Sequence, residues 1–167
     1  MSLEPALSTM SDAVALWYVG AGSAAGIVRA ACELLVAGAD GPSLCALAAV
    51  SFRHADEEVP ELLEAAMQEV GLAFHPRGTI AAHEAGIRVM ASRVLTGDLT
   101  PKALAVWAWS TFPMAPVELP RELKLLGFDY EYLDEYAEVG VTLERSAEQL
   151  DAEIVAEARR IVASGRR

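Results

Sequence analysis

The residues most able to act chemically lie in one stretch, GFDYEYLDEYAE, in which aromatic and acidic side chains alternate. On a helix Phe128, Tyr132 and Tyr136 line up at steps of four, and Asp134 and Glu138 form a second row with the same step. Aromatic rings beside fixed negative charge suit capture of a basic protein surface, because charge steers the encounter and the rings carry affinity. The alternative is an ordinary amphipathic helix whose tyrosines are half-buried in the core. The predicted partner-binding surface comprises Asp129, Tyr130, Tyr132, Asp134, Glu135, Tyr136 and Glu138.

A second aromatic cluster, VWAWSTFPMAP, begins just before a proline-rich stretch. On a helix Trp107 and Trp109 lie about 200° apart, so one of them is expected to face solvent, and exposed tryptophan is enriched at interaction sites. A second hypothesis is therefore a small-molecule or lipid-binding bundle, with an apolar pocket lined by Trp107, Trp109 and Met114. Core filling is the alternative role for these side chains.

Glycines near the N-terminus could serve a different chemistry, the binding of a nucleotide pyrophosphate by backbone amides. In WYVGAGSAAG, Gly20 and Gly22 are two residues apart and Ala25 takes the third small position. Asp40 follows about 20 residues after the first glycine. This spacing resembles the opening βαβ unit of flavin- and NAD-binding enzymes, and the resemblance implies a pyrophosphate at a helix N-terminus.

The residues flanking these glycines argue against a nucleotide site. The preceding residues, SDAVALWYV, keep a helical spacing where the fingerprint needs a strand, and Gly41 with Pro42 leads into another helical pattern. We therefore predict no cofactor, and we interpret Gly22 and Gly26 as a flat strip on a long first helix against which a neighbouring helix packs. Each interior glycine costs a helix about 1 kcal/mol relative to alanine, which leaves open a kink or break between Gly20 and Gly22.

The histidines and cysteines show no catalytic or metal-binding pattern. His54, His75 and His83 form no HExxH and have no Glu three residues before them, and no GxSxG, P-loop or Cys-His-Asn pattern occurs. Cys32 and Cys45 lie in alanine-rich surroundings without a CxxC, which predicts buried, reduced thiols and a cytoplasmic location. We predict no metal site and no catalytic residue. An enzyme of unknown class is the third hypothesis, because a triad can assemble from distant residues.

The charge of the chain is strongly negative and unevenly distributed. The formal net charge is −11, and between residues 118 and 157 there are twelve acidic residues against three basic ones. Such a field repels phosphate backbones and attracts cations, so we predict a basic protein partner and no nucleic acid. An uncharged run from Ala13 to Val28 is shorter than the roughly 20 residues of a membrane-spanning helix, so no membrane segment is predicted. Homo-oligomers are left open.

Turn signals divide the chain into helical lengths that must position these side chains. No window alternates with the period of a strand, and Gly127 is expected to interrupt the acidic-aromatic helix. We predict an all-α fold, a single domain over residues 1–167 built as a bundle of six or seven helices, with residues 1–10 as an N-terminal tail. The expected helix starts are Asp40 with Pro42, Asp56, Thr79, and Thr100 with Pro101, and the expected stops are Gly38, Gly71 and Gly97.

Three stretches together resemble a known group of proteins. AGADGPSLCALAAV, VLTGDLTPKALAVW and the acidic-aromatic segment before a final charged helix are similar to small all-helical bacterial proteins of unknown function, frequent in actinobacteria. The resemblance implies a helical fold and supplies no catalytic residue, cofactor or substrate. In charge, the chain is also similar to bacterial immunity proteins, which mask a basic toxin surface, and this analogy suggests an inhibitor.

Overall fold

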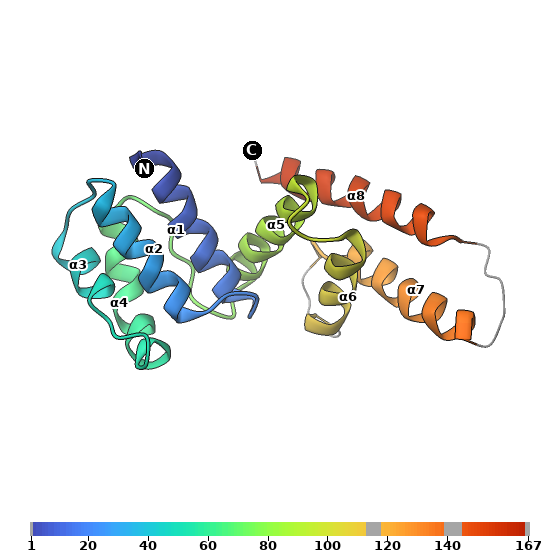
Figure 1. Ribbon diagram of the computed structural model, residues 1–167, viewed down its shortest axis with the longest axis horizontal. Coiled ribbons are helices and arrows are strands. Elements are labelled where there is room, and N and C mark those ends of the chain that lie inside the picture. Colours follow the sequence, from blue (N-terminus) through green and yellow to red (C-terminus); the bar gives the residue numbers. More distant parts are fainter. Residues whose placement is uncertain (1, 113–117, 139–144, 166–167) are drawn as a thin grey trace. The chain divides into compact units, whose positions relative to one another are not determined.

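The computed structural model describes residues 2–112, 118–138 and 145–165, without the side chains of residues 137 and 138. These residues form eight α-helices and no strand, which confirms the all-α fold and exceeds the predicted six or seven helices. The helices are α1 Leu3–Tyr18, α2 Ala24–Val36, α3 Pro42–Ala48, α4 Ala55–Glu69, α5 Ile80–Thr96, α6 Pro101–Thr111, α7 Arg121–Glu138 and α8 Ala147–Ser164 (Figure 1).

The predicted long first helix is two helices, α1 and α2, separated by a turn at the glycines. Gly20 takes a positive φ of 70°, and the amides of Ala21 and Gly22 both donate to the Leu16 carbonyl, at 2.9 and 3.1 Å. Ser23 then caps α2, because its hydroxyl accepts a hydrogen bond from the Gly26 amide at 3.1 Å. The glycines therefore end one helix and allow another to begin.

The prediction of an N-terminal tail over residues 1–10 is wrong from Leu3 onwards. Helix α1 begins at Leu3, and Ala6 and Met10 are fully buried in the core. Their spacing of four places both side chains on one face of α1. Burial of that face stabilises the helix, which capping residues alone would not do.

Most predicted helix boundaries agree with the structure to within a residue or two, but α3 begins differently. Thr100 caps α6 and Pro101 is its first residue, and Gly71, with a φ of 73°, follows α4. At α3 the residue before the helix is Gly41 rather than Asp40. The first free amides of α3, those of Ser43 and Leu44, donate to the Glu69 carboxylate at 3.2 and 2.8 Å. Glu69, at the end of α4, therefore caps the N-terminus of α3 in place of a neighbouring residue.

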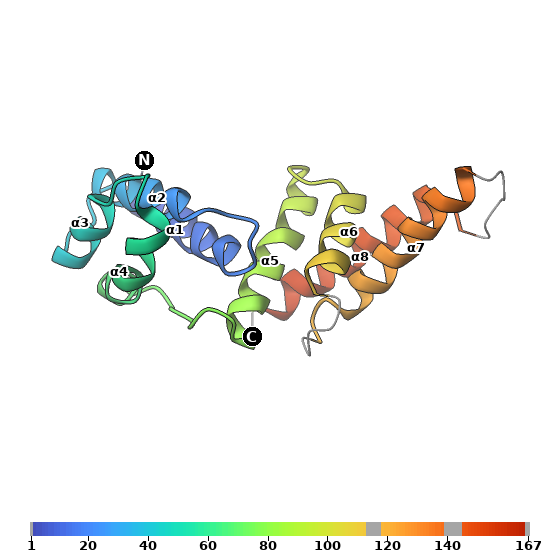
Figure 2. The same cartoon turned by 90° about the horizontal axis from the view of Figure 1, so that it is seen from below.

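The chain divides into two compact units, residues 1–86 and residues 87–167, and the division falls within the sequence of α5. In the first unit α1 and α2 lie side by side and α4 packs with α2 and α3 (Figures 1 and 2). Its core is aliphatic and sulfur-rich, with Met10, Ile27, Leu34, Leu63 and Met67 at most 1% exposed. That the whole chain is a single domain stays a prediction.

In the second unit α6 and α7 make the closest helix pair, at the position of Gly127. A Cβ atom at Gly127 would overlap the Ala105 carbonyl and would lie 2.9 Å from the Trp109 Cβ. The predicted interruption at Gly127 is wrong, since α7 runs through it without a break. The glycine is explained by contact between helices rather than by a turn.

None of the helices in the described residues combines the length and apolar character that a helix needs to cross a membrane.

Candidate functional site

Four aromatic rings form a continuous row over α6 and α7. The ring centroids of Trp109 and Phe128 are 5.4 Å apart, those of Phe128 and Tyr132 are 4.9 Å apart, and those of Tyr132 and Tyr136 are 5.4 Å apart. Phe128 and Tyr132 are 40% and 42% exposed. We call Trp109, Phe128, Tyr132 and Tyr136 the aromatic row. Contacting rings at these distances hold one another in place, so the row is a preformed apolar surface within an acidic environment.

Trp109 joins the row from α6 because an acidic residue of α7 holds its indole. The indole Nε1–H donates a hydrogen bond to the Glu131 carboxylate at 2.8 Å. The close approach of the two helices at Gly127 brings Trp109 within reach of this partner. The sequence placed Trp109 in a different candidate site, and no local signal connects it to a residue 22 positions later.

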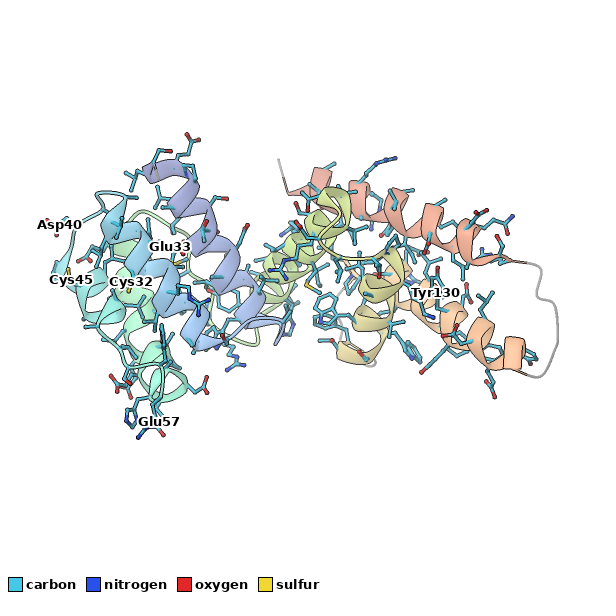
Figure 3. All side chains as sticks on the ribbon, in the orientation of Figure 1. Cys32, Glu33, Asp40, Cys45, Glu57 and Tyr130 are labelled. Carbon is cyan, nitrogen blue, oxygen red and sulfur yellow. The ribbon has the colours of Figure 1, made fainter. Side chains whose placement is uncertain are left out.

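Tyr130 lies between Asp129 and Glu131 in the sequence, but it is separated from the exposed surface. Figure 3 labels Tyr130 on α7. Its side chain is 2% exposed, and its hydroxyl donates to the carboxylate of Asp151 on α8 and lies 3.1 Å from the Ala147 carbonyl. Burial, the hydrogen bond to Asp151 and the charges of Asp151 and Asp134 hold the pKa of Tyr130 well above its ordinary value. Tyr130 therefore joins α7 to α8 as a neutral phenol and offers no surface to a partner.

Two of the predicted acidic residues are paired within the chain. Asp134 binds Lys102 of α6, whose Nζ lies 2.7 and 3.0 Å from the two carboxylate oxygens. Asp129 binds Arg145 at 2.8 Å, and Arg145 also lies 3.6 Å from Glu153 of α8. These ion pairs are exposed and contribute little to stability, but they cancel the charges of Asp129 and Asp134 near the surface.

The negative charge beside the aromatic row comes from Glu131 and Glu135. Both side chains are exposed, and in the described part of the chain neither has a basic partner. On α7 Glu131 follows Phe128 by three residues and Glu135 follows Tyr132 by three, a spacing that makes side chains neighbours on a helix surface. Glu138 belongs to α7, but its side chain falls outside the described residues. The arrangement presents adjacent rings with two carboxylates that no basic side chain of the described residues neutralises, although Glu131 accepts the hydrogen bond from Trp109. Such a surface suits a partner bearing arginine or lysine.

The second predicted site is not assembled by the described residues. Trp107 is half-buried and packs edge-on against Phe112, with their ring centroids 5.6 Å apart, whereas Trp109 belongs to the aromatic row. Met114 lies outside the described residues. Between α7 and α8 there is instead a groove of about 640 Å³, lined by Leu125, Leu126 and Ala156 together with charged side chains.

The glycine motif lacks the context that a nucleotide site requires, since a helix precedes it where the fingerprint has a strand. The expectation that Gly22 and Gly26 form a packing strip is wrong. A Cβ at Gly26 would meet only the Ser23 hydroxyl, at 3.4 Å, and one at Gly22 would meet the end of α1. Close helix packing is found instead at Gly127 and at Gly86, where a Cβ would lie 2.6 Å from the Ala15 carbonyl.

The two cysteines are free thiols, as predicted, but both are exposed (Figure 3). The prediction of burial is therefore wrong. The Cys32 Sγ lies 3.5 Å from the Ala48 carbonyl. Among the residues that the structure describes, no three His, Cys, Asp or Glu side chains come together as metal ligands.

No family model, no curated protein and no solved structure matches this chain. The resemblance to small helical actinobacterial proteins therefore stays a prediction. The function has to be inferred from the surface itself.

Proposed function

We propose that this chain is an interaction module that binds a basic protein partner through the aromatic row together with Glu131 and Glu135. The observation that carries the proposal is the row itself, four rings in mutual contact with Phe128 and Tyr132 about two-fifths exposed. Contiguous exposed apolar patches often mark interaction sites, and aromatic side chains are enriched at the energetic centres of protein interfaces.

The charge beside the row supports a basic partner rather than a neutral one. Asp129 and Asp134 are paired with Arg145 and Lys102, so the carboxylates next to the rings that keep their negative charge unneutralised are those of Glu131 and Glu135. A guanidinium group of a partner could lie over a tyrosine face and bind a carboxylate at the same time. The net charge of −11 would speed the encounter with any cationic partner.

The proposed partner-binding residues are fewer than the predicted set and include three additions. Tyr132, Glu135 and Tyr136 remain from that set, and Trp109, Phe128 and Glu131 join them. Tyr130 is excluded by its burial. An inhibitor that masks a basic active surface, as bacterial immunity proteins do, is the specific form of this function that charge and exposed rings favour.

Capture of partners from the native host, followed by quantitative mass spectrometry, tests the proposal. Tyr132→Ala removes a central ring and Glu135→Lys reverses a free charge. Phe52→Ala and Glu61→Lys make the same changes at exposed positions of the first unit. We expect a basic protein that is captured by the wild type and by both control variants, and that is lost with Tyr132→Ala and Glu135→Lys. Equal capture by all five proteins would contradict the proposal.

A further inference from the structure

A pocket of about 320 Å³ opens in the first unit, between the end of α1, the middle of α4 and the segment that joins α4 to α5. Its volume lies at the lower end of the range for ligand sites, about 300–1,000 Å³. The walls are mainly apolar and aromatic, with two charged side chains, which is the usual composition of a small-molecule site. The lining residues are Trp17, Pro60, Leu63, Glu64, Phe74, Pro76 and Arg77.

Tyr18 holds in place the segment that forms one side of this pocket. The Tyr18 side chain is 5% exposed, and its hydroxyl accepts a hydrogen bond from the His75 amide at 3.0 Å. The ring of Tyr18 also lies beside the imidazole of His75, with centroids 6.3 Å apart. Phe74 and Pro76 flank His75 in the chain, so this anchor fixes two walls of the pocket before any ligand arrives.

Arg77 supplies the polar group that would orient a ligand. Its guanidinium carbon lies 4.5 Å from the centroid of the Trp17 ring, a cation–π contact that holds the side chain at the pocket. No carboxylate of the described residues forms an ion pair with Arg77, whereas Glu64 accepts a hydrogen bond from the Gln68 amide at 3.1 Å. A guanidinium that is positioned but not neutralised is suited to two parallel hydrogen bonds with a carboxylate.

We propose that this pocket binds a small aromatic carboxylate, with its ring against Phe74, Pro60 and Leu63 and its carboxylate on Arg77. The unpaired guanidinium selects an anion, the aromatic and proline walls select a flat apolar body, and the volume limits its size. The site lies in the first unit and shares no residue with the aromatic row. Its failure would therefore leave the proposed partner surface untouched, and the reverse also holds.

Titration of the full-length, ¹⁵N-labelled protein with benzoate, neutral benzamide and phenylalanine tests this site by NMR. We expect benzoate to shift the Trp17 indole N–H signal and the Phe74 and Arg77 amides along saturable curves. Benzamide should bind about tenfold more weakly, which is the effect of losing one charge-assisted hydrogen-bonded contact. Arg77→Gln should weaken benzoate binding by a similar factor, and Arg53→Gln, an exposed arginine outside the pocket, should leave it unchanged.

Several outcomes would overturn the assignment. Shifts that stay linear with benzoate concentration would show that benzoate does not bind at a specific site. Equal affinities for benzoate and benzamide would show that the pocket does not recognise the carboxylate. Equal benzoate binding by the wild type and Arg77→Gln would show that Arg77 does not bind the ligand. Tighter binding of phenylalanine than of benzoate, lost in Glu64→Gln, would show a zwitterionic ligand in place of a simple carboxylate. The comparison of benzoate with benzamide uses the wild type alone, so it stands even if a variant folds poorly.

Discussion

The hydroxyl of Tyr130 on α7 donates a hydrogen bond to the carboxylate of Asp151 on α8, although Tyr130 lies within the most acidic stretch of the chain. The ring is 2% exposed, and the Lys102 Nζ lies 5.3 Å from its centroid. One tyrosine of the stretch therefore joins two helices, while Tyr132, two residues further on, faces solvent. This division separates residues that hold the second unit together from residues that are available to a partner.

Replacing Tyr130 by Phe should lower the free energy of unfolding by about 1–3 kcal/mol, because a buried hydrogen bond to a charged group is lost. Urea unfolding at neutral pH, followed by circular dichroism, measures the change. Tyr132→Phe is the matched control and should stay within about 0.5 kcal/mol of the wild type, since its side chain is exposed. Equal effects of the two substitutions would show that the Asp151 contact does not stabilise the fold.

Stability should fall in alkaline solution, and Tyr130 should account for part of the fall. Burial and the partner Asp151 raise the pKa of Tyr130 above the ordinary tyrosine value of about 10. The unfolded chain therefore releases the phenolic proton at a lower pH than the folded chain does. The stabilisation is complete below about pH 10 and decreases as the pH rises further, by up to about 1.4 kcal/mol per pH unit for one group.

Unfolding midpoints in urea measured from about pH 8 to about pH 11 test this dependence. Burial also raises the pKa of Tyr18, so Tyr130→Phe should reduce the alkaline slope without abolishing it. Identical slopes for the wild type and Tyr130→Phe would contradict the raised pKa.

Gly127→Ala should destabilise the protein even though alanine is the better helix former. Helix propensity favours alanine by about 1 kcal/mol, but the added Cβ would overlap the Ala105 carbonyl and crowd Trp109. Overpacking of this kind costs about 1–3 kcal/mol, so we expect a lower thermal midpoint. Gly26→Ala is the control: its Cβ would meet only the Ser23 hydroxyl at 3.4 Å, and we expect an unchanged or higher midpoint. A higher midpoint for both variants would mean that α6 and α7 are not in close contact.

Glu69→Ala should weaken the start of α3. The carboxylate accepts hydrogen bonds from the amides of Ser43 and Leu44, and removal of a helix cap costs about 0.5–2 kcal/mol. Hydrogen exchange of the Leu44 amide should become faster than the loss of global stability alone explains. Glu61→Ala, an exposed glutamate of α4, should leave that amide unchanged. Slow exchange of Leu44 in both variants would contradict the cap.

The helix boundaries could be predicted because their signals are local. Thr100 and Pro101 begin α6, and Gly38 and Gly71 follow α2 and α4. Each of these effects depends on one residue's own backbone preference or on an amide three positions away. The start of α3 could not be predicted in the same way. Its cap, Glu69, lies 26 positions after Ser43 and 25 positions after Leu44 in the sequence.

The candidate site was predictable only along one helix. The spacing of Phe128, Tyr132 and Tyr136 indicated three rings of the aromatic row, because residues four apart share a helix face. Trp109 comes from α6, and Lys102 neutralises Asp134 from 32 positions away. Neither contact can be predicted from the local sequence pattern, because both depend on how α6 packs against α7.

The central claim is that the aromatic row forms the partner-binding surface together with the carboxylates of Glu131 and Glu135. The affinity of the captured basic partner for the wild type and for Tyr132→Ala, Glu135→Lys, Phe52→Ala and Glu61→Lys, measured by titration calorimetry, tests it most directly. We predict an affinity loss of at least about tenfold for Tyr132→Ala, which corresponds to about 1.4 kcal/mol. Glu135→Lys should weaken binding and its salt dependence together, and the two control variants should bind like the wild type. Equal losses for Glu135→Lys and Glu61→Lys, with none for Tyr132→Ala, would show that net charge alone attracts the partner and would contradict the claim.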